Sequence, residues 1–292
     1  MVRDTYDRLT VGNTQLAYVE RGAGEPVVFV HGGLSDLTYL EPMAGAFAGR
    51  FRAIAYSRRY AWPNHRLPDG AADPIEVQVQ DLAGLVAGLR AAPAHLVGHS
   101  WGASVCLLLA AQHPELTRTL TLIEPEVFAL FVGSPPSPLR ILRLAVKRPR
   151  TAMIVIKAAN DAMAIRKAYK SGADERAVRI ALNWANGFDF YAEMDPAIRS
   201  HLMENVAFSR AGALADPINI RVEDVMRIRC PTLLVVGELS PKLFRVSIDE
   251  LSRIIGTAQV YVVPHASHGM ISQNPQALNE AIYRFLASTG ES

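Results

Sequence analysis

The residues best suited to chemistry are Gly98-His99-Ser100-Trp101-Gly102, where glycines stand two positions before and after a serine. This G-x-S-x-G pattern is typical of a nucleophile elbow, a sharp turn from strand to helix that exposes the serine hydroxyl above a sheet. Small flanking residues are needed because the two backbones pass close together. A serine at a helix N-terminus also lies where amide dipoles favour developing negative charge. We therefore predict that Ser100 is a nucleophile.

Two further features supply the partners that a serine nucleophile needs. A general base must take the hydroxyl proton, and N–H donors must hold the oxyanion of a tetrahedral intermediate. His268, in the stretch PHASHGM, is the candidate base. The candidate donors are the amide of Trp101 and an amide of Gly32 or Gly33. All three features follow predicted strands, and open α/β sheets bind ligands at the carboxyl ends of their strands.

The elements that must position these residues alternate along the chain. Short apolar runs predict strands, and a helical period predicts two helices in the first half. The strands are expected over Leu16–Glu20, Pro26–His31, Phe51–Tyr56, Ala94–Gly98 and Leu120–Ile123, with helices over Ile75–Arg90 and Ala103–Gln112. This alternation indicates a mostly parallel sheet covered on both faces.

The middle of the chain differs from both ends. From Val127 to about Arg229 the pattern is helical without strong strand signals. The strand–helix alternation then resumes, with buried strands expected over Thr232–Gly237 and Ala258–Val263 and a helix over Pro275–Leu286. We predict a core domain of residues 1–126 and 231–292, interrupted by a helical domain of residues 127–230.

The order of an HGG stretch, then GHSWG, then PHASHG resembles the α/β-hydrolase superfamily. This resemblance covers roughly residues 16–126 and 231–286. It implies an α/β-hydrolase fold with a mostly parallel eight-stranded sheet, helices on both faces and a helical cap inserted after the sixth strand. It also implies a Ser–His–acid triad and no cofactor.

The acid position departs from the commonest pattern of that family. Most members carry an aspartate in a G-x-x-D turn after the cap, but here the turn ends in Ser240. A hydroxyl cannot stabilise an imidazolium as a carboxylate does. A minority of the family, similar to zearalenone hydrolases and some haloalkane dehalogenases, takes a glutamate after the strand that precedes the cap. That position corresponds to Glu124, which we favour; Glu126 and Glu238 remain alternatives.

Other histidines have simpler interpretations. His265 is a rival base, but its offset from the family pattern favours a loop position. His99, inside the elbow, is expected to pack beneath the turn. His31 is expected to support the oxyanion loop through hydrogen bonds.

Residues for substrate binding are predicted less directly. Leu34 follows the glycines, and Arg59 lies in a loop with aromatics that suits a carboxylate or a ring. The alternative for this arginine is that it holds neighbouring loops together. Phe128 and Trp184 belong to a set of aromatics that fits either a pocket lining or the core of the cap: Trp101, Phe128, Phe131, Trp184, Phe188, Phe190 and Tyr191.

The beginning of the helical insertion is strongly basic. No acidic residue lies between Val127 and Asn160, and an apolar stripe accompanies the cations. The basic residues are Arg140, Arg143, Lys147, Arg148, Arg150 and Lys157. Such a pattern fits a solvated helix face, an anionic substrate or a membrane surface.

Composition excludes several classes of protein. The 292 residues are 50% hydrophobic and 20% charged, which indicates a globular core, and the net charge of +2 argues against a nucleic-acid binder. Two cysteines predict neither a disulfide framework nor a metal site. The charged N-terminus predicts no signal peptide, and no apolar run is long enough for a membrane span. We therefore expect a cytoplasmic protein whose partner is a small carbonyl substrate; the sequence leaves the oligomeric state open.

Together these features predict a serine hydrolase that cleaves a carboxylic ester or a lactone through an acyl-enzyme. A carbon–carbon bond hydrolase or a thioesterase would use the same residues. A non-catalytic, hydrolase-like ligand receptor is an alternative of another class. Family members that act as dehalogenases or epoxide hydrolases use aspartate where this chain has Ser100.

Overall fold

The computed structural model describes residues 6–68 and 73–289. Residues 1–5 lie outside the described part of the chain, and they belong to the segment in which no signal peptide is predicted. The first and last residues of the predicted core domain also lie outside it.

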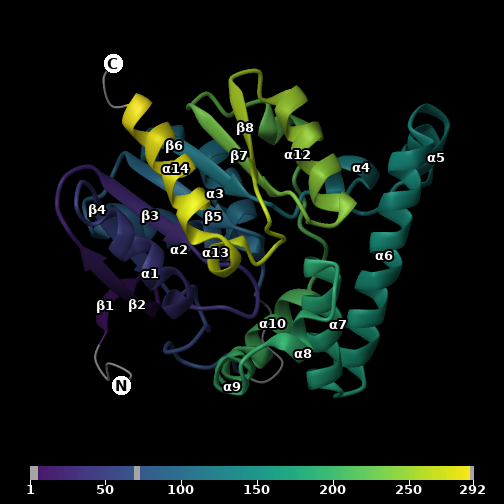
Figure 1. The fold of residues 1–292 in the computed structure, drawn as a ribbon, viewed down its shortest axis with the longest axis horizontal. Coiled ribbons are helices and arrows are strands. Elements are labelled where there is room, and N and C mark those ends of the chain that lie inside the picture. Colours follow the sequence, from purple (N-terminus) through teal and green to yellow (C-terminus); the bar gives the residue numbers. More distant parts are fainter. Residues whose placement is uncertain (1–5, 69–72, 290–292) are drawn as a thin grey trace.

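An eight-stranded sheet forms the centre of the molecule (Figure 1). Its spatial order is β1-β2-β4-β3-β5-β6-β7-β8, with β1 and β2 antiparallel to their neighbours and the remaining pairs parallel. The strands are β1 (Asp7–Val11), β2 (Thr14–Arg21), β3 (Pro26–Val30), β4 (Arg52–Tyr56), β5 (Ala94–His99), β6 (Thr117–Ile123), β7 (Thr232–Gly237) and β8 (Ala258–Val263). The predicted α/β-hydrolase fold with a mostly parallel sheet is confirmed.

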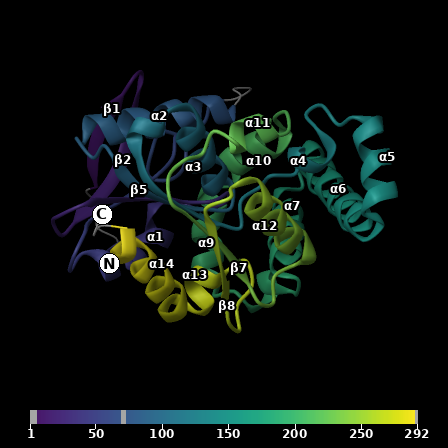
Figure 2. The ribbon, with the colours of Figure 1, turned by 90° about the horizontal axis from the view of Figure 1, so that it is seen from above.

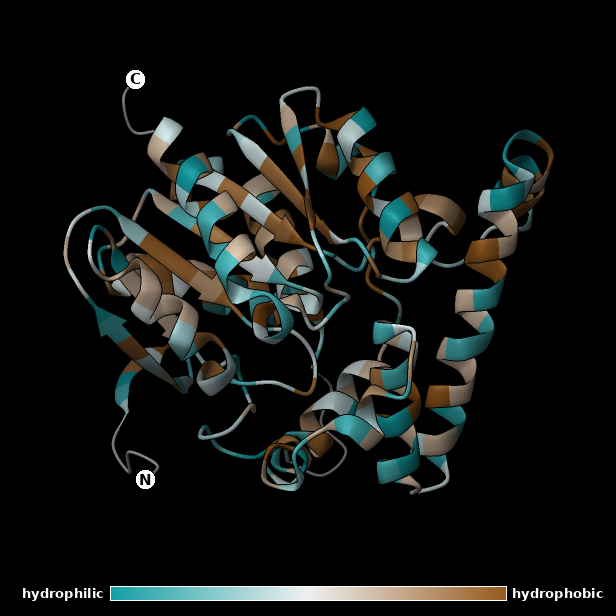
Figure 3. Cartoon of the chain, in the orientation of Figure 1, coloured by the Kyte–Doolittle hydropathy of each residue, from teal (hydrophilic) through white to brown (hydrophobic). Residues whose placement is uncertain are grey.

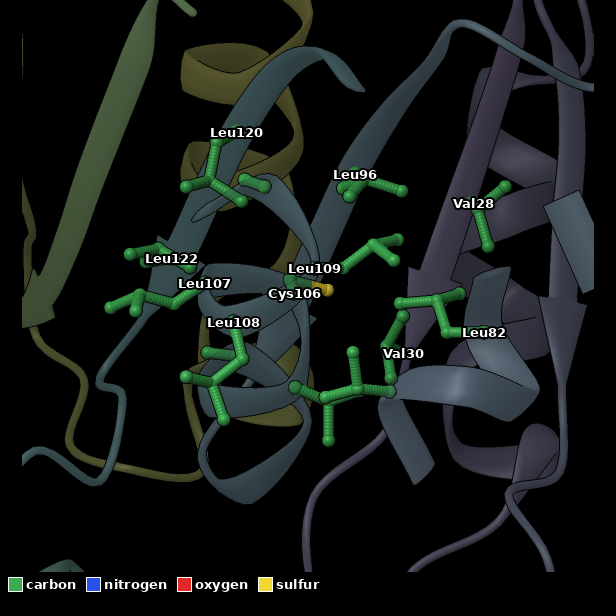
Figure 4. Packing of buried hydrophobic residues seen from close by; sticks show 14 of the residues in the cluster. Val28, Val30, Leu82, Leu96, Cys106, Leu107, Leu108, Leu109, Leu120 and Leu122 are labelled. Carbon is green, nitrogen blue, oxygen red and sulfur yellow. The ribbon is translucent and has the colours of Figure 1, made fainter. Parts of the chain in front are cut away.

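Helices cover both faces of this sheet (Figure 2). Helices α1 (Leu37–Phe47), α13 (Met270–Gln273) and α14 (Pro275–Thr289) pack with one hydrophobic cluster. The other cluster, part of which Figure 4 shows, packs with α2 (Ile75–Gly88), α3 (Trp101–Gln112) and α12 (Lys242–Ile254). A short 3-10 turn, η1 (Pro114–Leu116), follows α3. Alternate residues of β3 serve the two sides, Val28 and Val30 on one and Val27 and Phe29 on the other. Burial on both faces explains why the strands read as continuous apolar runs.

The strand that ends the sheet corrects one prediction. β8 has the predicted bounds, but it is an edge strand and is not buried: Val260 and Val262 are 45% and 37% exposed. Several elements were not predicted, among them β1, α1, α12 and α13. β1 reads DRLTV, which carries too many polar residues to look like a buried strand, and α1 contains Pro42 inside the helix.

All the helices from α4 to α11 lie between β6 and β7. Most of them lie along the right-hand side and in the lower part of Figure 1, and they carry a mixture of polar and apolar residues (Figure 3). They are α4 (Ala129–Val132), α5 (Pro138–Lys147), α6 (Pro149–Lys170), α7 (Asp174–Asn186), α8 (Phe190–Glu193), α9 (Pro196–Glu204), α10 (Val206–Leu214) and α11 (Val222–Val225). Within the described residues, no helix combines the length and apolar character needed to cross a bilayer.

Candidate active site

Ser100 occupies a strained turn between β5 and α3. Its φ of 54° and ψ of −124° place a non-glycine residue in a sparsely populated region, as a nucleophile elbow requires. The Ser100 amide donates to the Ile123 carbonyl oxygen over 2.8 Å, which ties the turn to β6. A Cβ atom on Gly98 or on Gly102 would overlap neighbouring backbone, so both glycines are needed for this close approach.

Glu124 and His268 form a short hydrogen-bonded pair. The His268 Nδ1 atom lies 2.6 Å from Glu124 Oε2, and the Glu124 side chain is fully buried. The other carboxylate oxygen, Oε1, accepts a hydrogen bond from the Gly237 amide over 2.8 Å. The Glu124 backbone adopts a φ of 47°, which turns the chain immediately after β6. This carboxylate, anchored to β7, is the one that can orient His268 and stabilise its charged form.

The His268 ring is held between two other rings. Phe244 of α12 stacks on it with ring centroids 4.5 Å apart and planes 14° apart, and His99 lies 4.6 Å away on the basis of ring centroids. His99 Nε2 is 3.0 Å from the His268 carbonyl oxygen. Burial, and then the His268 charge, lower the pKa of His99 to about 3, so His99 is a neutral packing residue at ordinary pH. His99 is 7% exposed, as expected for a packing residue.

The loop after β3 reaches the nucleophile. A Cβ atom on Gly32 would lie 3.0 Å from Ser100 Cβ, so this backbone approaches the serine directly. The same atom on Gly33 would meet nothing within 4 Å, so the space beside the Gly33 Cα atom is open. His31 supports the loop as predicted: its Nδ1 is 2.9 Å from the Gly32 carbonyl oxygen, and its Nε2 accepts from the Arg58 amide over 2.8 Å.

Arg58, the residue before Arg59, was not predicted as a site residue. Its guanidinium donates to the carbonyl oxygens of His31 and Gly32 over 3.0 and 2.8 Å. It lies between two aromatic rings, 4.3 Å from the Trp101 centroid and 4.6 Å from that of Phe208. Burial lowers the pKa of Arg58 to about 10. Arg58 thus fixes the loop that carries Gly32 and Gly33. The sequence feature that could have indicated Arg58 is the pair of adjacent arginines, Arg58-Arg59, shortly after β4.

Arg59 points in a different direction and corrects a prediction. Its guanidinium forms a two-pronged salt bridge with Asp81 of α2, over 2.6 and 2.7 Å, and also bonds Asn13 Oδ1. The salt bridge raises the pKa of Arg59 above its ordinary value. Arg59 therefore holds neighbouring elements together and is not directed at the nucleophile. The structural alternative considered for this loop is the one that the contacts favour.

The other predicted substrate-binding residues are dispersed. Leu34 is 5% exposed and packs against Val178 and Tyr191 of the insertion, which is a packing position. Phe128 is half-buried beside a cluster centred on Phe131, Val132 and Val155. Trp184 contacts Phe244, with ring centroids 5.8 Å apart, and lines an open groove of about 620 Å³ between α6 and α7.

The two remaining carboxylate candidates do not bond His268. Glu238 is exposed and accepts from the His265 amide over 2.7 Å, while the His265 side chain is 89% exposed. Glu126 instead lies near the nucleophile, because Ser100, together with the charges of His268 and Arg58, acts to lower the pKa of its carboxyl. Loss of hydration raises the pKa of the Glu126 carboxyl, and the charges of His268 and Arg58 act in the opposite direction. The residue as a whole is nevertheless exposed. Its backbone is fixed to α3 by two 3.0 Å hydrogen bonds with Ser104 Oγ.

Asn186, the last residue of α7, also escaped prediction. Its Oδ1 accepts from the Gly269 amide over 3.0 Å and from Ser267 Oγ over 2.8 Å, on either side of His268. An asparagine in a polar helix gives no sequence signal for such a contact. The contact matters because it connects the insertion to the loop that carries the histidine.

Across the described ranges, no group of three histidine, cysteine, aspartate or glutamate side chains is arranged to hold a metal ion. The structure holds near this end of the sheet a hydroxyl on a strained turn, an imidazole paired with a carboxylate, and backbone amides.

Fold and site together define a hydrolase of the α/β class. The chain belongs to the alpha/beta hydrolase family, whose pattern it matches over residues 27–281. It is 28% identical to 2-(acetamidomethylene)succinate hydrolase of Mesorhizobium japonicum, over 96% of this chain and 94% of that protein. It is 25% identical to the sn-1-specific diacylglycerol lipase ABHD11 of Mus musculus, over 89% of this chain and 80% of that one.

Solved structures share the fold at lower identity. An esterase from Thermogutta terrifontis superposes with a TM-score of 0.72 at 22% identity, covering 98% of this chain and 99% of the esterase. The enol-lactonase of Burkholderia xenovorans gives a TM-score of 0.68 at 21% identity, covering 96% of this chain and all of that one.

Proposed function

We propose that the protein hydrolyses a carboxylic ester or a lactone through an acyl-enzyme on Ser100. The observation that carries this proposal is the 2.6 Å contact between His268 and Glu124, in a fold that presents Ser100 on a strained turn. Membership of the alpha/beta hydrolase family supports hydrolysis as the reaction type. The bond to be cleaved is proposed from the serine on the elbow and the imidazole that is paired with Glu124.

In the proposed mechanism, Ser100 Oγ attacks the substrate carbonyl carbon while His268 Nε2 takes the hydroxyl proton. The oxyanion accepts hydrogen bonds from the amides of Trp101 and Gly33. His268 then gives its proton to the leaving alkoxide, and the carbon–oxygen bond breaks to leave the acyl-enzyme. Water attacks that ester, loses a proton to His268 and releases the carboxylic acid with Ser100 restored. Glu124 stabilises the imidazolium that forms in each half-reaction.

We propose a second task for the helical insertion, that residues 127–230 act as a cap over Ser100. Two buried polar contacts support it. Asn186 of α7 holds the His268 loop, and Asn205 at the start of α10 bonds Asp36 Oδ2 and the Trp62 amide, each over 2.8 Å. The cap would carry the aromatic side chains that select the acyl or alcohol group.

Glu126 favours a substrate that lacks negative charge beside the scissile carbonyl. Glu126 is exposed and its carboxyl lies near Ser100, whereas Arg58 is only 1% exposed. A substrate would therefore meet the carboxylate before the guanidinium. The Mesorhizobium relative is named for a succinate derivative, a dicarboxylate, and we propose that this chain accepts a less acidic substrate.

A matched pair of esters tests the proposed hydrolysis and the proposed role of Glu126 in substrate choice. We expect wild-type protein to hydrolyse p-nitrophenyl pentanoate with a higher kcat/KM than p-nitrophenyl hemisuccinate, and Ser100→Ala to hydrolyse neither above background. Glu126→Gln should narrow the difference between the esters by roughly ten- to hundredfold. Glu115→Gln is the control, because it removes the same charge from an exposed position. Folded wild-type protein that turns over no ester or lactone would overturn the proposed function. An unchanged ester ratio in Glu126→Gln would overturn only the role of Glu126.

A further inference from the structure

Helix α5 presents an apolar stripe to solvent. Leu139, Leu142 and Val146 are 56%, 61% and 74% exposed, and their spacing of three and four residues places them on one side of the helix. The helix is attached by a different side, where Ile141 and Leu144 pack against the cluster of Phe131, Val132 and Val155. The exposed stripe therefore points away from the body of the protein.

The first half of α6 continues this arrangement. Met153 and Ile156 are 72% and 49% exposed and lie three residues apart on one side of the helix. Helices α5 and α6 pack together, and Figures 1 and 2 both place α5 at the extremity of the molecule, beyond the other helices of the insertion. Nothing else in the described chain covers the outer side of α5. We call the exposed residues of this region the α5–α6 surface.

The cations of the α5–α6 surface are unpaired. Arg140, Arg143, Lys147 and Arg150 are exposed, and none of them forms a salt bridge with any described residue. In contrast, Arg148 pairs with Glu250 and Lys157 with Asp161. No acidic residue occurs between Val127 and Asn160. The surface thus combines four free positive charges with five exposed apolar side chains.

We propose that the α5–α6 surface binds an anionic phospholipid membrane, with α5 lying in the plane of the interface. The apolar side chains would enter the boundary between headgroups and acyl chains, and the arginines and lysine would contact phosphate groups. Charge decides between the possible occupants. A second copy of this chain would bring the same unpaired cations to a symmetric contact, which would repel. The proposal goes beyond the proposed function and does not depend on it.

Vesicle flotation of the full chain tests the proposal. We expect wild-type protein to float with phosphatidylcholine–phosphatidylglycerol vesicles at low salt, to float far less with phosphatidylcholine alone, and to dissociate at high salt. Arg143→Gln/Lys147→Gln should weaken binding to the anionic vesicles by roughly tenfold or more. Leu142→Ser/Val146→Ser should weaken it comparably, because it removes the inserted stripe.

The matched control is Lys167→Gln/Lys170→Gln, which removes two exposed charges from the opposite end of α6 and should bind as wild type. Thermal melting checks that each variant is folded. Equal binding to neutral and anionic vesicles would overturn the proposal, as would unchanged binding in both surface variants. A dimer in vesicle-free sedimentation that is lost in Leu142→Ser/Val146→Ser would assign the surface to a second copy instead.

Discussion

His268 Nδ1 lies 2.6 Å from Glu124 Oε2, although the two residues follow strands that do not touch. Glu124 follows β6 and His268 follows β8, and β7 lies between these strands in the sheet. The Glu124 side chain reaches His268 past the carboxyl end of β7. There the amide of Gly237, the last residue of β7, donates a hydrogen bond to the second carboxylate oxygen of Glu124. In this chain the carboxylate that contacts His268 follows β6, while Ser240 occupies the turn after β7 where the commonest family pattern has an aspartate.

The position of the acid gives the first prediction. Glu124→Gln should lower kcat by roughly two to four orders of magnitude with little change in melting temperature, since the neutral amide cannot stabilise the imidazolium. Glu238→Gln is the matched control, because Glu238 is exposed and bonds the His265 backbone. Steady-state kinetics on a soluble ester measure both. Glu124→Gln activity close to wild type would discard this assignment.

The two neighbouring arginines should behave differently. Arg58→Lys loses the paired contacts to the carbonyl oxygens of His31 and Gly32, so we expect kcat to fall by roughly ten- to hundredfold as the oxyanion loop loosens. Arg59→Lys weakens the salt bridge to Asp81 and should lower the melting temperature while kcat is retained. Kinetics and thermal melting on both variants make the comparison. A larger loss of kcat in Arg59→Lys would reverse these roles.

A buried carboxyl predicts the pH dependence of stability. Burial raises the pKa of Asp73 to about 6, above its value in an unfolded chain, although Gln78 Nε2 donates to it over 2.7 Å. The folded state therefore holds the proton more tightly, and this contribution to stability is lost as pH rises through the interval from about 4 to 6. Asp73→Asn, which keeps an acceptor for Gln78, should gain about 2–3 kcal/mol over wild type at pH 7 and nothing near pH 4.

Urea denaturation of wild type and Asp73→Asn at several pH values measures this difference, in which the titration of all other groups cancels. A stability difference that stays constant with pH would show that Asp73 does not titrate in the folded protein as described.

The elbow glycines give a packing prediction. A Cβ atom on Gly102 would overlap the carbonyl oxygens of Val30 and His31, so Gly102→Ala should cost about 1–3 kcal/mol or more and displace the oxyanion loop. Gly45→Ala is the matched control within α1, where a Cβ atom meets nothing within 4 Å, and it should stabilise the protein by about 0.5–1 kcal/mol. Equal unfolding free energies for the two variants would contradict this account of the turn.

The sequence predicts the buried parts of this fold well and the polar parts unevenly. β7 has the predicted bounds because a strand covered on both faces must be apolar throughout. β1 was missed because an edge strand tolerates polar residues, and β8 was predicted as buried although Val260 and Val262 face solvent. The apolar pattern of a segment indicates that it forms a strand, but it does not indicate whether the strand lies in the centre or at the edge of the sheet.

In the candidate site, residues whose type and local motif carry the chemistry were predictable, and those that act through long-range contacts were not. Ser100 and Gly102 stand in one five-residue pattern. Arg58 and Asn186 act through carbonyl and amide groups far away in sequence, so nothing near them signals the contact. Arg59 attracted the substrate-binding prediction because a buried partner such as Asp81 cannot be seen from the sequence.

The central claim is that Glu124 and His268 activate Ser100, and intact-mass measurement after reaction with a fluorophosphonate probe tests it most directly. We predict a single adduct on wild-type protein, no adduct on Ser100→Ala, and labelling of Glu124→Gln slowed by at least tenfold. No adduct on folded wild-type protein, or labelling that persists in Ser100→Ala, would contradict the account.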